Sequence, residues 1–379
     1  MKKRDRKVLL SHVKRVVVKI GSSVLTDDHG ELLVDVFEEI AREISGIKSK
    51  GLDTIVVSSG AIASGMKKLN LKEKPQEISI KQAIAACGQS SLMWCYEKAF
   101  SAFGERVAQI LLTHDGLSER KRFLNARKTL LTLLRMGIIP VVNENDTVAV
   151  EEIMFGDNDS LAALVTSLVE ADLLILLTNI DGLYTDDPRN HSEAEFIPVI
   201  EEIDQEIQKM ARDTFGRTTT GGMKTKIEAA KAAAAFGVPT IIANGKRPST
   251  LSSIFAGKEL GTLFLPARER LKGRKHWIAF TLKPSGDLVI DKGAKRAIIA
   301  LGKSLLPSGI KEVHGKFDLG ESVRCVDENG VEVARGLASY SSNEIKRIIG
   351  AKTSDIEKIL GYKYSDEIIH RDDLVVSKG

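Results

Sequence analysis

The sequence predicts an α/β protein built on a mainly parallel sheet, followed by a small β-rich domain. Over the first two thirds of the chain, strand-like apolar runs alternate with amphipathic helical stretches, which is typical of a parallel sheet with helices on both faces. The rest changes to short strand-like runs with glycine turns and one helical stretch, 294–301. Because 379 residues exceed what one hydrophobic core usually supports, we expect two domains, 1–268 and 276–379, joined by a polar linker within 266–275.

The composition predicts a soluble cytoplasmic protein with no membrane contact. Hydrophobic residues make up 43% and charged residues 28%, as in ordinary globular domains, and no apolar run approaches the roughly 18 residues of a membrane span. The basic start, 1–7, lacks the apolar region of a secretory signal. Cys87 and Cys95 fall on one predicted helix, about 12 Å apart along its axis and too far for a disulfide, which favours a reducing compartment.

Charge is unevenly distributed along the chain. Residues 1–269 carry 35 Lys and Arg against 36 Asp and Glu, whereas residues 270–379 carry 20 against 15. The net charges are therefore −1 and +5, and the excess positive charge lies in the C-terminal part.

The segment 15–24 holds the first candidate for chemistry. Its β-branched run, Val16 to Val18, predicts a strand buried on both faces, and Gly21 ends that strand. Lys19 lies at the carboxyl end of the strand, where open α/β sheets bind ligands. A buried lysine is costly unless an anion meets it, so Lys19 is a candidate anion contact. The alternative is that its side chain extends along the strand edge to water.

Continuous apolar runs and helical stripes place the other elements of the first domain. The expected strands are 53–58, 107–112, 138–142, 171–178 and 239–243, and the expected helices are 34–50, 78–103, 120–136, 161–169 and 227–236. The strand at 171–178 is the most apolar, so we expect it at the centre of the sheet. Close packing is predicted for the helix at 78–103 from its small residues, Ala83, Ala85, Ala86 and Gly88.

Polar clusters follow two of these strands. Ser59 and Gly60 follow the strand at 53–58, where small residues let a ligand approach the backbone and a helix N-terminus offers free N–H groups. After the strand at 138–142, eighteen residues contain Glu144, Asp146, Glu151, Glu152, Asp157, Asp159, Asn143, Asn145 and Asn158. A solvated turn explains part of this set, with Asp159 or Ser160 capping the helix at 161–169. The density of carboxylate and amide side chains in these eighteen residues favours a small-molecule site for an amino group or a metal-bound phosphate.

The segment 217–226 precedes the helix at 227–236 and combines four threonines, two glycines and two lysines. Such groups at a helix N-terminus suit a polyphosphate. The segment does not have the spacing of a Walker A loop, because Gly222 and Met223 stand before Lys224 and no strand directly precedes it.

Seven segments, in this order, resemble motifs of the amino acid kinase family and, within it, of the glutamate 5-kinases. They are VVKIGSSV (17–24), VSSGAIASG (57–65), FLNAR (123–127), NEND (143–146), GDND (156–159), GLYTDDPR (182–189) and TGGMKTK (220–226). The matches cover roughly residues 12–265, and together they are far more specific than any one alone. The tail resembles the PUA domain in PSGDLVIDKGA (284–294), SLLPSGI (304–310) and GYKY (361–364). The resemblance implies a three-layer sandwich with a mainly parallel sheet, plus a small PUA-like barrel.

The resemblance also implies a reaction. ATP would phosphorylate the side-chain carboxylate of L-glutamate, giving L-glutamyl 5-phosphate in the first step of proline biosynthesis, with Mg²⁺ bridging the phosphates of ATP. Transfer to a carboxylate brings anions together, so fixed cations are the expected catalytic groups. The acceptor is already ionised, so no His or Cys base is expected. Free L-proline is implied as an inhibitor in a site overlapping that of glutamate, and a homo-oligomer, dimer or tetramer, is implied as the assembly.

Residue roles carry over by the same resemblance. Lys19 and Lys226 would be catalytic, with Asp159 holding both. The implied glutamate site consists of Ser59, Gly60, Asn143, Asp146, Asp157 and Asn158, with Asp146 facing the α-ammonium group. The implied nucleotide site consists of Lys19, Thr178, Asn179, Thr220, Gly221, Gly222, Met223, Lys224, Thr225 and Lys226. No residue is assigned as a metal ligand. Two positions depart from the family pattern: Asn179 replaces the usual Asp, and Lys224 replaces a small residue.

Two other classes of function stay open. One is another acid kinase of the same fold, acting on aspartate, N-acetylglutamate, carbamate or UMP; the motifs at 143–146 and 156–159 and the PUA-like tail argue against it. The other is an RNA-binding protein with a kinase-like domain, since PUA domains often bind RNA. The modest net charge of the tail, without a dense Lys/Arg stripe, argues against RNA. The aromatic residues Trp277, Phe280 and Phe317 are expected in the core.

Overall fold

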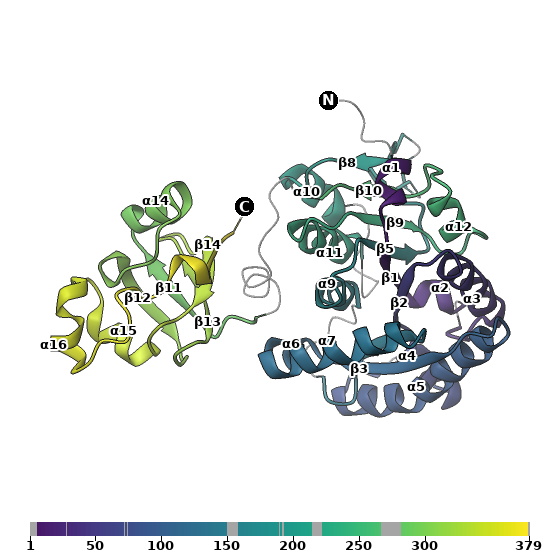
Figure 1. Ribbon diagram of the computed structural model, residues 1–379, viewed down its shortest axis with the longest axis horizontal. Coiled ribbons are helices and arrows are strands. Elements are labelled where there is room, and N and C mark those ends of the chain that lie inside the picture. Colours follow the sequence, from purple (N-terminus) through teal and green to yellow (C-terminus); the bar gives the residue numbers. More distant parts are fainter. Residues whose placement is uncertain are drawn as a thin grey trace. The chain divides into compact units, whose positions relative to one another are not determined.

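The computed structural model describes residues 6–27, 29–71, 73, 75–149, 158–188, 190–191, 193–213, 222–266 and 282–377. The chain divides into two compact units, Met1–Arg270 and Leu271–Gly379 (Figure 1). The predicted domain limits, 268 and 276, fall outside the described residues. No helix in the described ranges has the length and apolar character needed to cross a membrane.

The first unit is built on an eight-stranded sheet whose strands lie in the order β3-β4-β2-β1-β5-β9-β10-β8. The strands are β1 Arg15–Ile20, β2 Asp53–Ser58, β3 Val107–Leu112, β4 Ile139–Glu144, β5 Leu173–Thr178, β8 Val199–Ile200, β9 Thr240–Asn244 and β10 Thr262–Phe264. All neighbours pair in parallel except β9 and β10. The mainly parallel sheet is therefore confirmed, and β5, predicted at the centre, is a central strand with β1 beside it. Outside this sheet, β6 Leu183–Tyr184 pairs antiparallel with β7 Phe196–Ile197.

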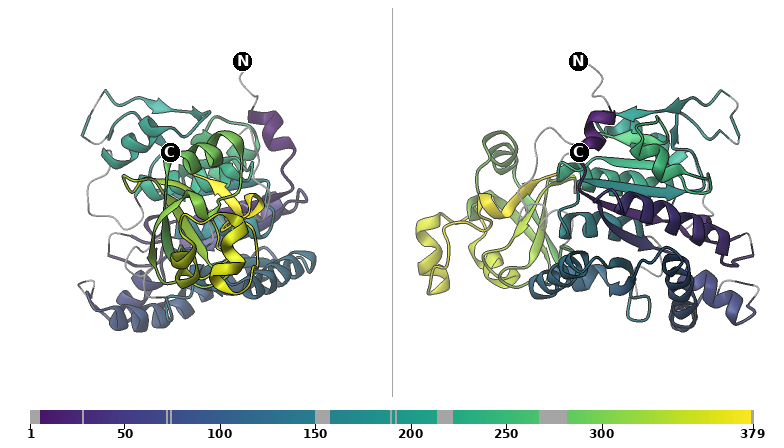
Figure 2. Two further views of the ribbon diagram at one scale, coloured as in Figure 1. Left: turned by 90° about the vertical axis from the view of Figure 1, so that its left-hand side faces the viewer. Right: turned by 45° about the vertical axis from the view of Figure 1, so that its right-hand side comes forward.

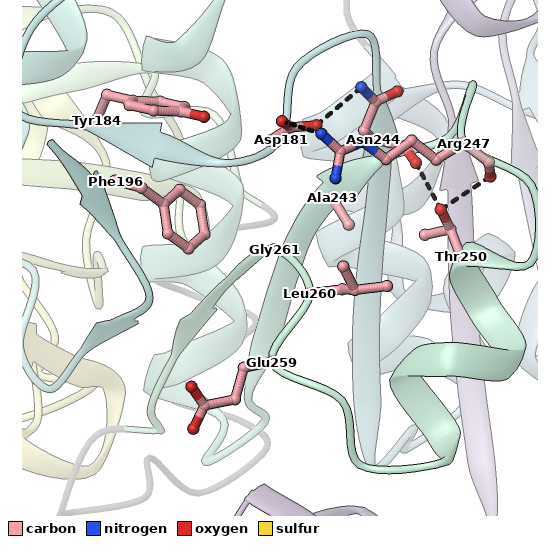
Figure 3. A pocket seen from close by; sticks show the side chains of 10 residues that line it. All are labelled: Asp181, Tyr184, Phe196, Ala243, Asn244, Arg247, Thr250, Glu259, Leu260 and Gly261. Carbon is pink, nitrogen blue, oxygen red and sulfur yellow. Dashed lines mark hydrogen bonds and ion pairs between the residues drawn. The ribbon is translucent and has the colours of Figure 1, made fainter. Parts of the chain in front are cut away.

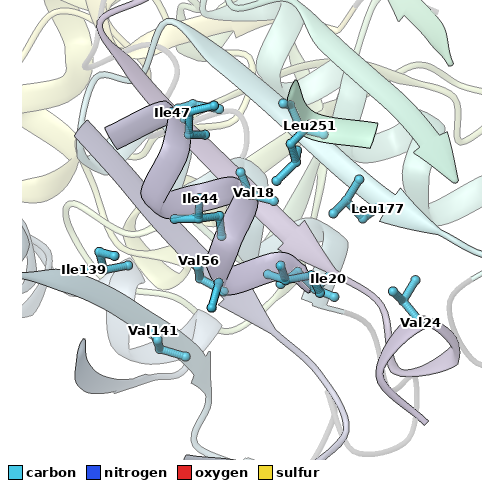
Figure 4. Packing of buried hydrophobic residues seen from close by; sticks show 14 of the residues in the cluster. Val18, Ile20, Val24, Ile44, Ile47, Val56, Ile139, Val141, Leu177 and Leu251 are labelled. Atoms are coloured by element: carbon cyan, nitrogen blue, oxygen red, sulfur yellow. The ribbon is translucent and has the colours of Figure 1, made fainter. Parts of the chain in front are cut away.

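Helices cover both faces of this sheet and make three layers (Figures 1 and 2). The helices of the first unit are α1 Arg6–Ser11, α2 Ser22–Leu25, α3 Val34–Lys48, α4 Ala61–Lys68, α5 Ile78–Ser101, α6 His114–Ser118, α7 Arg120–Arg135, α9 Asn158–Leu168, α10 Gln205–Asp213, α11 Met223–Ala235 and α12 Thr250–Phe255. Successive side chains of β1 point to opposite faces of the sheet, and each set packs against helices on its own face. Val18 and Ile20 pack with α3 and α12 in the cluster of Figure 4, whereas Val17 packs with α9 and α11.

Two helices begin earlier than predicted, and this changes the role of the residues at their starts. The helix expected from residue 161 begins at Asn158, and the helix expected from residue 227 begins at Met223. The prediction that Asp159 or Ser160 caps the first of these helices is wrong, because both residues lie inside its first turn. The carboxylate of Asp159 is thereby available for side chains of other elements.

The close packing predicted for α5 is confirmed at its contact with α4. A side-chain carbon on Gly88 would lie 1.9 Å from the carbonyl oxygen of Ala61, and one on Gly65 would lie 1.9 Å from that of Ile84. These glycines let the two helix backbones touch. Gly60, directly before α4, has φ = 105°, a left-handed conformation that favours glycine. The start of α4 is therefore held tightly against the middle of α5.

The C-terminal unit contains a five-stranded sheet in the order β12-β11-β13-β14-β15. Its elements are β11 Gly286–Ile290, α14 Lys292–Leu301, β12 Ile310–Gly315, β13 Ser322–Val326, β14 Glu332–Leu337, α15 Ser342–Ile348, α16 Ile356–Leu360 and β15 Leu374–Val376. The β-rich character is confirmed, but the expectation of one helix is wrong, since α15 and α16 accompany α14. Phe317 is buried in this core as predicted, whereas Trp277 and Phe280 lie outside the described residues.

Candidate active site

The first two residues of α9, Asn158 and Asp159, reach two separate groups of buried polar side chains. Both residues are buried, with 9% and 0% of their surface exposed. The helix begins opposite the carboxyl ends of β1, β2 and β4, because the parallel strands all end on this side of the sheet. We call the group around Asp159 the ionic cluster (Lys19, Asp159, Thr225, Lys226). The group around Asn158 is the amide chain (Gln89, Asn143, Asn158).

The ionic cluster joins three elements that lie far apart in the sequence. Lys19 Nζ, from β1, lies 2.5 Å from Asp159 Oδ1, and Lys226 Nζ, from the first turn of α11, lies 2.9 Å from Asp159 Oδ2. Thr225 Oγ1 donates a hydrogen bond to Asp159 Oδ2 at 2.9 Å. The side chains of the two lysines are only 5% and 6% exposed. The alternative that Lys19 extends to water is therefore wrong.

The charges of the ionic cluster are two ammonium groups against one carboxylate. Burial alone would raise the pKa of Asp159, but the adjacent ammonium groups of Lys19 and Lys226 outweigh burial and hold this pKa well below its usual value. Asp159 is therefore ionised at neutral pH. Counted over its four named residues, the cluster carries one net positive charge in a site shielded from water, where an approaching anion is attracted strongly.

The amide chain links α5, β4, α9 and the end of β2. Asn158 Nδ2 donates to Asn143 Oδ1 at 2.7 Å and to the carbonyl oxygen of Ser58. Asn143 Oδ1 also accepts from the backbone N–H of Glu144, and Asn143 Nδ2 donates to Gln89 Oε1 at 2.7 Å. The structure thus joins Asn143 and Asn158, which were predicted together. It adds Gln89, which the sequence analysis missed.

Other predicted acceptor-site residues lie beside the amide chain. Ser59 is half-buried and directly follows β2, and Gly60 is the N-cap residue of α4 and has no side chain to cap it. Asp146 is half-buried in the turn after β4. Asp157 lies outside the described residues. The binding roles of these residues stay predictions.

The predicted nucleotide residues divide between two places. Thr178 is buried at the end of β5, and Asn179 follows it. Gly222 to Lys226 form the start of α11, with Met223 buried. Lys224 is exposed and lies 3.8 Å from Glu228, one helical turn further on. Thr220 and Gly221 lie outside the described residues.

A pocket that sequence reasoning did not foresee lies near the carboxyl ends of β5 and β9 (Figure 3). It is lined by Asp181, Tyr184, Phe196, Ala243, Asn244, Arg247, Thr250, Glu259, Leu260 and Gly261. Asp181 accepts hydrogen bonds from Asn244 at 2.9 Å and from Arg247 at 2.6 Å. The rings of Tyr184 and Phe196 meet edge to face on its wall. None of the predicted site residues lines this pocket.

No three His, Cys, Asp or Glu side chains within the described ranges are grouped closely enough to hold a metal ion. The one carboxylate at the centre of the ionic cluster, Asp159, is occupied by two lysines and Thr225.

Comparison with known proteins places these groups in context. Residues 14–244 match the model of the amino acid kinase family, and residues 286–360 match that of the PUA domain. The glutamate 5-kinase of Geobacter sulfurreducens is 54% identical over 371 residues, which are 98% of this chain and 100% of that protein. The glutamate 5-kinase of Caldanaerobacter subterraneus subsp. tengcongensis is 53% identical over 362 residues, 96% and 97% of the two chains. The solved structure of UMP kinase from Ureaplasma parvum, at 15% identity and a TM-score of 0.48, is too distant to bear on the substrate.

Proposed function

The chain belongs to the amino acid kinase family, and from this membership we propose that it transfers the γ-phosphoryl group of ATP to the side-chain carboxylate of L-glutamate. Two glutamate 5-kinases match it over nearly the whole length of both chains, at more than half identity. The observation that carries the chemistry is the buried ionic cluster, with Lys19 and Lys226 fixed on the two oxygens of Asp159. The product is L-glutamyl 5-phosphate, which serves proline biosynthesis.

The reaction forms a bond between a carboxylate oxygen and the γ-phosphorus and breaks the bond to the oxygen that bridges the β- and γ-phosphorus atoms. The attacking carboxylate is already ionised, so no base has to remove a proton. The difficulty is electrostatic, because two anions approach and negative charge spreads over the transferred group. Lys19 and Lys226 supply fixed positive charge at the end of β1 and at the start of α11. Asp159 holds these ammonium groups in position, so that they need not reorganise during the reaction.

We assign the nucleotide to the segment that begins α11 and to the end of β5. Gly222 and Met223 present backbone N–H groups at a helix start, and Thr178 and Asn179 contribute polar groups at the neighbouring strand end. Mg²⁺ would bridge the phosphates and offset their charge, with its ligands supplied by phosphate and water. The exposed Lys224 would contact the nucleotide only after leaving Glu228. The pocket of Figure 3 is not assigned to either substrate.

The proposal is tested by an assay of the purified chain with ATP, Mg²⁺ and three acceptors: L-glutamate, L-aspartate and N-acetyl-L-glutamate. Hydroxylamine traps an acyl phosphate as a hydroxamate, which reports the reaction directly. We expect turnover with L-glutamate and little with the other two acids. Equal rates on all three acceptors would contradict the substrate assignment.

Inhibition by free L-proline is part of the proposal. In the sequence, the segment 147–155 lies between the predicted acceptor-site residues Asp146 and Asn158, and its residues 150–155 lie outside the described residues. We expect proline to compete with glutamate and not with ATP. The measurement is the initial rate at millimolar proline over a range of glutamate concentrations. Inhibition that saturating glutamate cannot relieve would argue against an overlapping site.

A homo-oligomer and a division of labour between the units are also proposed. All residues of the ionic cluster and the amide chain lie in the first unit, so a chain ending near Arg268 should keep glutamate kinase activity. Specific activity and circular dichroism of that shortened chain, beside the full chain, test this. A folded but inactive product would mean that the C-terminal unit completes the site.

RNA binding by the C-terminal unit gains no specific support. A pocket there is lined by Lys303, His370 and Arg371 but also by Asp291 and Glu367. Such mixed charge does not favour a polyanion. Retention on immobilised RNA that weakens with salt would be the observation needed to reopen this alternative.

A further inference from the structure

We propose that Gln89 determines acceptor specificity by binding the α-carboxylate of the amino acid through its side-chain amide nitrogen. This inference rests on the proposed function and names which part of the acceptor one further residue binds. Gln89 lies in the middle of α5, and its Oε1 accepts a hydrogen bond from Asn143 at 2.7 Å.

The orientation of every amide in the chain is fixed by backbone groups at two points. The carbonyl oxygen of Ser58 can only accept, so the group of Asn158 that meets it must be the NH₂. The backbone N–H of Glu144 can only donate, so the group of Asn143 that meets it must be the oxygen. Asn143 therefore turns its NH₂ toward Gln89, and Gln89 must accept this hydrogen bond with its side-chain oxygen. The NH₂ of Gln89 is left as a donor.

This donor is buried and has no hydrogen-bond partner among the described residues. An unsatisfied buried amide is costly, so a protein usually keeps one only where something else satisfies it. Its surroundings suit an anion. Gly88, the preceding residue, packs against Ala61 at the start of α4, and the N-cap residue of that helix, Gly60, has no side chain to cap it. The nitrogen of Gln89 and the first N–H groups of α4 are thus donors on two helices in direct contact, and we infer that the two oxygens of one carboxylate can take both.

The other end of the amide chain, at Asn158, offers a hydrogen-bond acceptor where the Gln89 end offers a donor. Both hydrogens of Asn158 Nδ2 are used, by Asn143 and by the carbonyl oxygen of Ser58, so its Oδ1 offers an acceptor. An acceptor at one end and donors at the other match an α-ammonium group beside an α-carboxylate. The ligand class is therefore a free α-amino acid, as opposed to a diacid without an amino group.

The test is the substitution Gln89→Glu. Glutamate at this position keeps an oxygen for Asn143 and nearly the same shape, but it replaces the free donor by a negative charge that repels a carboxylate. We expect the KM for L-glutamate to rise by about 10- to 100-fold, with kcat and the KM for ATP changed by less than about twofold. Gln89→Met, which is neutral and of similar length, should raise the same KM less than Gln89→Glu does. It keeps the inference testable if the charged variant fails to fold.

A second compound distinguishes the loss of α-carboxylate binding from a general structural effect of the substitution. The compound 4-aminobutyrate is L-glutamate without its α-carboxylate, and its inhibition constant against L-glutamate should be unchanged or lower in Gln89→Glu. Gln208→Glu is the matched control, because Gln208 also has a buried amide nitrogen without a hydrogen-bond partner among the described residues, but lies on α10, outside the amide chain. We expect wild-type constants for that variant.

A KM for L-glutamate that is insensitive to Gln89→Glu, or a fall in kcat with KM unchanged, would overturn the inference. Equal weakening of L-glutamate and 4-aminobutyrate would do the same. A wild-type chain that fails to phosphorylate L-glutamate would instead overturn the proposed function itself, so the two failures are distinguishable.

Discussion

The ionic cluster and the amide chain start from neighbouring residues of α9 but differ in the interactions that hold them together. In the amide chain every group is neutral, and each hydrogen bond has a fixed donor and a fixed acceptor. In the ionic cluster two ammonium groups share one carboxylate. Hydrogen-bond polarity distinguishes one ligand from another, because a mismatched partner leaves a buried group unpaired. Net charge lowers the energy of a transition state that carries more negative charge than the substrates do.

The two groups should therefore respond differently to mutation. Damage to the ionic cluster should lower kcat, and damage to the amide chain should raise the KM for the acceptor. The following predictions, ordered from the largest effect to the smallest, either sharpen this division or show that it is wrong.

The largest effect is expected for Asp159→Asn. The substitution removes the carboxylate that holds Lys19 and Lys226, so both ammonium groups lose their position and repel each other. We expect kcat to fall by about a thousandfold. Loss of a buried partner should also lower the free energy of unfolding by about 3–5 kcal/mol. Steady-state kinetics and urea unfolding measure the two effects. A variant with a raised glutamate KM and nearly normal kcat would contradict the division.

The same carboxylate predicts a pH dependence of stability. Because the pKa of Asp159 is lower in the folded than in the unfolded chain, its ionised form stabilises the fold. This contribution is complete above the unfolded value of about 4 and is lost as the pH falls below it. The difference in unfolding free energy between the wild type and Asp159→Asn should be constant from pH 7 to about pH 5 and should shrink toward pH 3. Thermal or urea unfolding at several pH values checks the sign.

The lysines come next. Lys19→Ala and Lys226→Ala should each lower kcat by about a hundredfold, with smaller changes in the KM for ATP. The double variant should lose less than the product of the single losses, because both lysines act on the same developing charge. Circular dichroism shows whether each variant is folded. A folded Lys19→Ala protein with normal kcat would remove Lys19 from the catalytic groups.

The amide chain should give the opposite signature. Asn143→Ala breaks the link between Gln89 and Asn158, so the acceptor site loses its fixed polarity. We expect the KM for L-glutamate to rise by about 10- to 50-fold, with kcat lowered by less than about fivefold. The KM for ATP serves as an internal control and should not change. If kcat fell as steeply as it does in the lysine variants, the two groups would have to be treated as one unit.

The smallest effect is expected at Thr225, whose hydroxyl donates to Asp159 Oδ2. Thr225→Val removes this hydrogen bond while keeping the shape, and it should lower kcat by about three- to tenfold through looser positioning of Asp159. Thr225→Ser keeps the hydroxyl and should restore most of the rate. Equal losses in both variants would assign Thr225 a packing role instead.

Features that depend on neighbouring residues could be predicted from the sequence, whereas features that depend on contacts between distant residues could not. Buried strands such as β1 and β5 are visible as apolar runs, because burial on both faces excludes polar residues locally. The starts of α9 and α11 were placed too late, because their first turns carry the polar residues of the site and so lack the apolar periodicity that marks a helix. The helix α15 was missed although its capping box, Ser341 with Glu344, is present in the sequence.

The candidate site shows the same limit. That Lys19, Asp159 and Lys226 belong together came from family resemblance, since no periodicity connects residues from three distant segments. No pattern in the sequence indicated a role for Gln89. It lies among small and polar residues of α5, and only the contact of Gly88 with α4 and the hydrogen bond to Asn143 bring it to the end of β4.

The adjacency of Asn158 and Asp159 has a consequence for how such an enzyme can evolve. Successive residues of a helix point about 100° apart, so one turn of α9 separates the proposed acceptor site from the charges proposed to drive transfer. A single codon change at Asn158 would alter the acceptor pocket while leaving Asp159 and its lysines in place. On the proposed roles, mutations that change acceptor binding and mutations that change phosphoryl transfer can therefore arise independently.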